Sequence, residues 1–210
     1  MLAVLVGLVI GLVACGGGSA QPNLSTATGP SSDGSVTSTP ASPTPSPSAS
    51  YPADVPLTGH NVKPGEKPPV YPVAANTRSQ AGANAFAEFF MKTFDWAYAT
   101  TNSAYVRHYT GPSCGLCKGL STGITKTAAE GHWYEGGRFT VHPAASTTIA
   151  PVTAPADYCS AIVVDETSQT VVDKTGKVIN GDGAHTGDHV KVCEKMSQQT
   201  WIATYLAFTP

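Results

Sequence analysis

The stretch from residue 16 to residue 50 most constrains what this chain can fold into. Of its 35 residues, 26 are Gly, Ser, Thr or Pro, and Asp33 is the only charged residue. Such a segment has too little apolar surface to offset the entropy lost on ordering, so we expect it to stay disordered. Prolines continue beyond it, through residues 64–72. We therefore predict a tether over residues 15–73 and a single folded domain over residues 74–210.

An apolar run precedes this tether and ends at Cys15. Residues 1–14 are Met, Leu, Ala, Val, Ile and Gly only. As a helix they would reach about 21 Å, which is short for crossing a bilayer but typical of a signal peptide. The end of the run, Leu12-Val13-Ala14-Cys15, resembles the bacterial lipobox. The resemblance implies that Cys15 receives diacylglycerol and becomes the mature N-terminus. The alternative is a buried core helix followed by an ordinary cysteine.

Charge and lipidation together suggest where the protein acts. The whole chain has a net charge of −2, and its Lys and Arg residues form no cluster beyond isolated pairs. This pattern argues against a nucleic-acid partner and against polybasic membrane binding. The first basic residue is Lys63, so either the true start lies upstream or the start codon is misassigned. We expect the protein at the cell membrane, lipid-anchored and facing the extracellular side.

The first part of the predicted domain has a helical period. Aromatic residues recur at helical spacing from Phe86 to Phe94, which predicts a helix over residues 79–100 with Ser79 or Thr77 as its cap. A short second helix is expected before Gly111-Pro112, and a third over residues 117–131.

After residue 137 the pattern favours strands. We expect them within residues 138–152, 157–173 and 189–208, with a hairpin turn at Thr175-Gly176 and a solvated loop over residues 180–189. His185, Asp188 and His189 in that loop could ligate a metal, but the neighbouring glycines make a loop without metal the favoured interpretation. Helices followed by strands predict an α+β fold, with N-terminal helices packed on a curved antiparallel sheet.

Several motifs together carry a family resemblance. They are the lipobox, the Ser/Thr/Pro stalk, the aromatic helix, SCGLC (113–117), YEGGRFTV (134–141), TVVDKTGKV (170–178) and WIATYLAF (201–208). Over about residues 70–210 the chain resembles an actinobacterial lipoprotein family, domain of unknown function family 6318. The resemblance implies a cystatin-like cone, like that of nuclear transport factor 2 and the steroid isomerases. It implies no activity, because the family has none assigned.

Four cysteines remain after Cys15, at positions 114, 117, 159 and 193. An even number in an exported domain predicts disulfides. We expect Cys114–Cys117 to fix the turn between two helices and Cys159–Cys193 to bridge two strands. The spacing of Cys114 and Cys117 also fits a redox-active pair, although a helix rather than a strand precedes it, and four cysteines could hold zinc. No cofactor or metal is expected.

Four residues are candidates for lining a pocket in the cone: Asp95, Trp96, Tyr105 and His108. In isomerase-like cones, pocket carboxylates and tyrosines perform the acid–base chemistry. Asp95 could equally be an exposed residue opposite the aromatic stripe, so no catalytic residue is assigned. We expect a non-catalytic domain that binds a small ligand or a cell-envelope protein. The alternatives are an isomerase- or hydrolase-like enzyme and a thiol–disulfide protein that uses Cys114 and Cys117.

Overall fold

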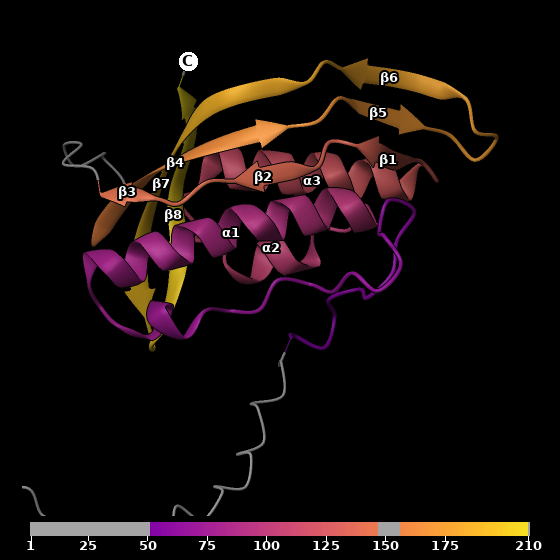
Figure 1. The fold of residues 1–210 in the computed structure, drawn as a ribbon. Helices are drawn as coiled ribbons and strands as arrows, with labels where there is room; N and C mark the ends of the chain where they lie inside the picture. Colours follow the sequence, from indigo (N-terminus) through magenta and orange to yellow (C-terminus); the bar gives the residue numbers. More distant parts are fainter. Residues whose placement is uncertain (1–50, 147–155, 210) are drawn as a thin grey trace, which may run out of the picture. The chain divides into compact units, whose positions relative to one another are not determined.

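The computed structural model describes residues 51–146 and 156–209. The predicted signal peptide, Cys15 and the tether up to residue 50 lie outside these residues. The helices are η1 (Val73–Asn76), α1 (Gln80–Thr100), α2 (Ala104–His108) and α3 (Gly115–Ala129). The strands are β1 (Trp133–Gly136), β2 (Phe139–Val141), β3 (Ala145–Ser146), β4 (Tyr158–Glu166), β5 (Gln169–Val172), β6 (Val178–Asp182), β7 (His185–Ser197) and β8 (Thr200–Thr209). The predicted α+β class is confirmed (Figure 1).

Helix α1 supplies most of the helical core. It begins where the Ser79 side chain accepts a hydrogen bond from the Gly82 amide, as the sequence predicts. Its aromatic stripe, from Phe86 to Phe94, is fully buried, and the helix packs against β4, β2 and β1. Burying each such ring contributes about 1.5–3 kcal/mol, so this stripe anchors the helix to the sheets.

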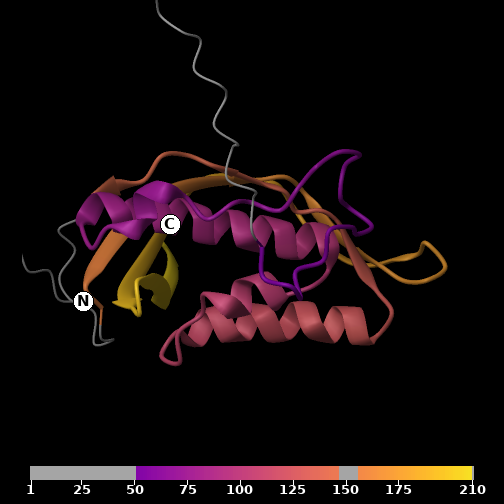
Figure 2. The same ribbon diagram turned by 90° about the horizontal axis from the view of Figure 1, so that it is seen from below.

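Helices α2 and α3 lie to one side of α1. Helix α2 packs against both α1 and α3, and it lies between them in Figure 2. Helix α3 contacts β8 and buries only three residues, Cys117, Ser121 and Ile124, whereas α1 buries twelve. The third helix is therefore held along one narrow stripe, and most of its surface remains exposed.

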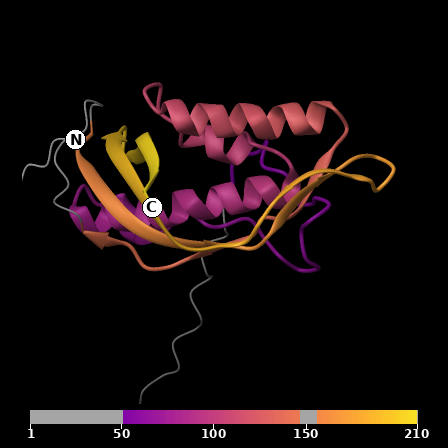
Figure 3. The same cartoon turned by 90° about the horizontal axis from the view of Figure 1, so that it is seen from above.

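Two antiparallel sheets form in the described residues. The larger has the order β2-β4-β7-β8, with β3 also paired to β4, and the smaller has the order β1-β5-β6. Only residues 167–168 separate β4 from β5, and only residues 183–184 separate β6 from β7. The long ribbons of the larger sheet consequently continue into the projecting hairpin of the smaller one (Figure 3). No helix in the described part is long and apolar enough to cross a membrane.

The predicted loop over residues 180–189 is wrong. Strands β6 and β7 include most of it, and within β7 His185 pairs with Glu166 and Asp188 with Val164 of β4. The glycines that suggested a loop instead accommodate an irregular ladder, because Gly187 has a φ of +73° beside a register shift in β4. Long-range pairing, which local composition does not report, decides the structure here.

The boundary predicted at residue 73 also needs correction. The predicted tether includes residues 51–73, but these residues pack on the helices. The Trp96 indole donates a hydrogen bond to the Pro56 carbonyl, and the Tyr105 hydroxyl donates to the Pro69 carbonyl. Val55 is buried in the core. Proline lacks a backbone donor but keeps its carbonyl, so a proline-rich segment can dock through its acceptors without joining a sheet.

Candidate functional site

A cavity of about 250 Å³ lies between α1, α3 and the strands, and we call it the inner pocket. Its apolar lining comes from Met91, Phe94, Tyr98, Leu120, Phe139, Leu206 and Phe208. Three of these residues belong to α1 and one to α3, so the pocket depends on the packing of both helices against the sheets. A partly open site with aromatic walls is suited to a small organic ligand.

Polar side chains from four strands or their ends line the same pocket. They are Glu166, Gln169, Asp182, His185 and Asp188. His185 Nε2 lies 3.6 Å from Asp182 Oδ1, and His185 stands opposite Glu166 in the ladder of β4 and β7. The pocket therefore combines an apolar lining with three carboxyl groups and one imidazole.

The Glu166 carboxyl is a perturbed group of the inner pocket. Burial is the main cause that raises its pKa. The nearby His185 opposes this effect, whereas Asp182 and Asp188 raise the pKa further. Ionised Glu166 thus lacks sufficient positive charge around it. A cation placed in the pocket would relieve that deficit.

Two neutral groups beside Glu166 can donate hydrogen bonds. Burial raises the pKa of the Tyr98 phenol, and the charge of Glu166 adds to this effect, so Tyr98 keeps its proton. The Gln169 Nε2 atom is buried and has no hydrogen-bond partner among the described residues. Within residues 51–146 and 156–209, no group of three or more His, Cys, Asp or Glu side chains is placed to hold a metal ion.

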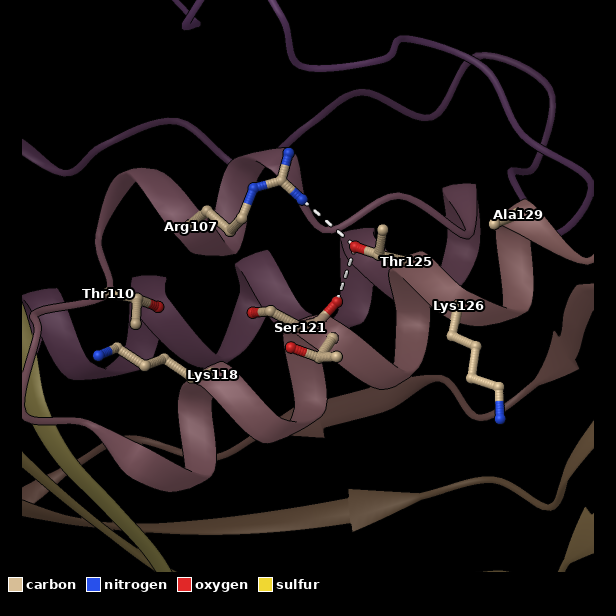
Figure 4. Close-up of a pocket in the computed structure, with 8 residues that line it drawn as sticks. Arg107, Thr110, Lys118, Ser121, Thr125, Lys126 and Ala129 are labelled. Atoms are coloured by element: carbon tan, nitrogen blue, oxygen red, sulfur yellow. Dashed lines mark hydrogen bonds between the residues drawn. The ribbon is translucent and has the colours of Figure 1, made fainter.

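A second cavity, of about 680 Å³, lies along α2 and α3, and we call it the helix groove (Figure 4). Its lining consists of Arg107, Thr110, Lys118, Ser121, Thr122, Thr125, Lys126 and Ala129. All three charged residues of this lining are cations. Its charge is therefore opposite to that of the inner pocket.

The model of DUF6318, a family of unknown function, matches residues 59–207. The chain belongs to this family. A comparison with curated proteins gave no match. Among solved structures, the intermembrane-space region of the chloroplast protein ARC6 is similar, at 16% identity and a TM-score of 0.38. That match covers 60% of this chain and 95% of the other chain.

In this DUF6318 domain, none of the four predicted pocket residues lines either of the two cavities. Asp95 binds the Arg138 guanidinium through both carboxylate oxygens, each at 2.8 Å, and also accepts the amide of Phe139. His108 Nε2 lies 2.5 Å from Asp54 Oδ1 at the surface.

All four predicted pocket residues hold the segment 51–69 in place. Three of the four residues contact the segment 51–69 directly: Trp96, Tyr105 and His108. Asp95 acts through Arg138, which also binds Glu66 of the same segment. The four residues therefore fix this segment on the DUF6318 domain.

The four cysteines form two disulfide pairs, Cys114–Cys117 and Cys159–Cys193. Cys159 and Cys193 face each other across β4 and β7, and Cys114 caps α3. Cys114 is 1% exposed and Cys117 is 0% exposed. A thiol from another protein must reach a sulfur atom to exchange with it, so this burial argues against a redox role for the DUF6318 domain.

Glu166, Gln169 and Tyr98 are not among the residues that the sequence predicts for a site, and His185 and Asp188 are predicted in a solvated loop. One feature of the sequence points to the polar side of the inner pocket. Acidic residues recur around the strands from position 165 to position 188. Only the strand register shows that they meet over an apolar lining.

Proposed function

We propose that this DUF6318 protein is a lipid-anchored protein of the bacterial cell surface whose domain binds a small organic cation in the inner pocket. The anchor rests on the lipobox-like residues that end at Cys15 and on the tether that follows. The two disulfides support an oxidising compartment outside the cytoplasm.

One observation carries the choice of ligand. Three carboxyl groups, from Glu166, Asp182 and Asp188, share the partly polar and partly apolar inner pocket with one imidazole. An opposite charge within about 4–6 Å favours the ionised form of a carboxyl group, so a bound cation would offset both burial and repulsion. The faces of the pocket aromatics also attract a cation.

The size of the pocket limits the ligand. Pockets for drug-sized molecules usually measure about 300–1,000 Å³, and the inner pocket measures about 250 Å³. A single ring or a short chain with one amine therefore fits better than a steroid. The amine would face Glu166, and the hydrocarbon part would contact Phe94 and Leu206.

Calorimetric titration of the purified full chain with benzylamine tests this proposal. Benzyl alcohol and benzoate serve as the neutral and anionic controls. We expect benzylamine to bind at least tenfold more tightly than either control. Its affinity should fall as the pH decreases from 7 towards 4.5, because Glu166 gains a proton and loses its charge.

Two matched variants sharpen this titration. Glu166→Gln should weaken benzylamine binding at least tenfold, whereas Glu135→Gln, which removes an exposed carboxylate on β1 outside the pocket, should leave it unchanged. Equal binding of benzylamine and benzyl alcohol, or full affinity in Glu166→Gln, would contradict the assignment of a cation site.

The anchor is tested separately in a bacterial host that is fed an alkyne-labelled fatty acid. The full chain with its native leader should take up the label and sediment with membranes. Cys15→Ser should lose both properties, because it removes the only sulfur at the lipobox-like site. A Cys15→Ser variant that keeps the label would rule out lipidation at this residue.

A further inference from the structure

The helix groove is a second site, separate from the inner pocket. Helix α3 lies between the two cavities: Leu120 lines the inner pocket, while Lys118 and Thr122 line the helix groove. Residues three or four positions apart share a helix face, and Lys118, Thr122 and Lys126 follow that spacing. One face of α3 therefore lines the helix groove, and another packs against the core.

The cations of the helix groove are only partly neutralised by the protein. Arg107 Nη1 donates to the hydroxyl groups of Ser103, at 2.5 Å, and Thr125, at 3.4 Å. The Lys118 ammonium donates to the Pro112 carbonyl. Neither side chain forms an ion pair within the described residues. Lys126 Nζ forms an ion pair with Glu130 at 3.7 Å, and Arg107 contributes, after the His108 hydrogen bond, to lowering the pKa of the Asp54 carboxyl.

The rest of the groove offers hydroxyl groups and carbon surface. Ser121 is 4% exposed, and its hydroxyl has no hydrogen-bond partner among the described residues. Figure 4 shows Ser121 and Thr125 on α3, with the Arg107 guanidinium of α2 bonded to Thr125. Threonine methyl groups, lysine methylenes and Ala129 supply apolar contacts between the charged ends.

From this arrangement we infer that the helix groove binds an anionic amphiphile, in which an alkyl chain carries a phosphate or carboxylate head group. The head group pairs with Arg107 and Lys118, which form no ion pair within the described residues. The chain lies over the threonine methyl groups and Ala129. The volume of about 680 Å³ accommodates the chain as well as the head group.

Titration of the full chain with dodecyl phosphate, below its micelle concentration, tests the inference. Dodecyltrimethylammonium and dodecanol provide the cationic and neutral controls. We expect dodecyl phosphate to bind at least tenfold more tightly than either control, and its affinity to fall as salt rises from 50 to 500 mM, because exposed charges are screened. Equal binding of the phosphate and the ammonium amphiphile would overturn the inference.

Three variants locate the binding site. Arg107→Gln should weaken dodecyl phosphate binding about tenfold, whereas Lys174→Gln, at the exposed β5–β6 turn, should not change it. Thr122→Trp fills the groove from an exposed position without changing the charge, and it should also weaken binding about tenfold. Full affinity in both Arg107→Gln and Thr122→Trp would place the amphiphile elsewhere and overturn the inference.

The same chemistry could come from a bilayer or from a free molecule, and vesicles distinguish these sources. Binding to phosphatidylglycerol vesicles but not to phosphatidylcholine vesicles, lost in Arg107→Gln, would assign a membrane lipid. Dodecyl phosphate binding without vesicle binding would assign a free amphiphile. Both results support the groove as an anion site, and neither depends on benzylamine binding in the inner pocket.

Discussion

The inner pocket and the helix groove share α3 but differ in charge and in burial. The pocket combines three carboxyl groups with apolar residues such as Met91 and Phe94, which are fully buried. The groove combines three cations with exposed residues such as Thr122. The two sites should therefore respond differently to truncation and to pH, even though α3 lines both of them.

The largest expected difference concerns stability. Phe94→Ala should lower the free energy of unfolding by about 3–5 kcal/mol, because it opens a cavity in a core that α1 and the sheet share. Thr122→Ala in the groove should change it by no more than about 0.5 kcal/mol. Urea unfolding of the two variants gives both values. A loss below about 1 kcal/mol in Phe94→Ala would show that the inner pocket is not part of the cooperative core.

This contrast also explains which features could be predicted from the sequence. Helix α1 was predictable because its period and its Ser79 cap are local signals. The pocket was not predictable, because Glu166 and His185 meet only through the pairing of β4 and β7. The groove was missed for a related reason. Arg107, Lys118 and Lys126 form no run in the sequence, and only the packing of α2 on α3 brings them to one cavity.

Glu194 illustrates the same limit inside the core. The sequence places it in a strand, where a charged residue is expected to face solvent. The ladder of β7 and β8 shifts register between Cys193 and Glu194, and the Glu194 side chain is fully buried. Burial raises the pKa of the Glu194 carboxyl well above the usual value, although hydrogen bonding from Ser160 opposes this effect. A strand irregularity of this kind leaves no reliable mark in one sequence.

Removing the disulfide in the larger sheet should lower the free energy of unfolding more than removing the disulfide at the start of α3. Cys159–Cys193 closes a loop of 34 residues in sequence separation within the larger sheet, and Cys114–Cys117 spans a separation of 3 at the start of α3. By loop-closure entropy, replacing the first pair with alanines should cost about 4 kcal/mol and replacing the second about 2 kcal/mol. Urea unfolding of the two double variants measures both losses. A larger loss from the Cys114–Cys117 pair would indicate that α3 matters more to folding than its three buried residues suggest.

The smallest expected effect is a difference in pH dependence between the two sites. The pKa of Glu166 is raised in the folded state, so the folded chain holds this proton more tightly than the unfolded chain does. The resulting stability is fully present below the unfolded value of about 4.5 and is lost as the pH rises through the folded pKa. Glu166→Gln should remove this dependence, so the variant should gain stability relative to the parent between pH 4.5 and 7.

Lys118→Gln in the groove is the matched control, because it also removes one charge, lies outside the inner pocket and forms no ion pair within the described residues. Its stability relative to the parent should stay constant over the same pH range. Thermal melts at half-unit pH steps compare the two variants, and the Glu166→Gln gain should be smaller than the loss from either disulfide. Parallel curves for Glu166→Gln and the parent would mean that the pocket carboxyl is well solvated. The inner pocket and the helix groove would then differ in the sign of their charges but not in how strongly burial affects those charges.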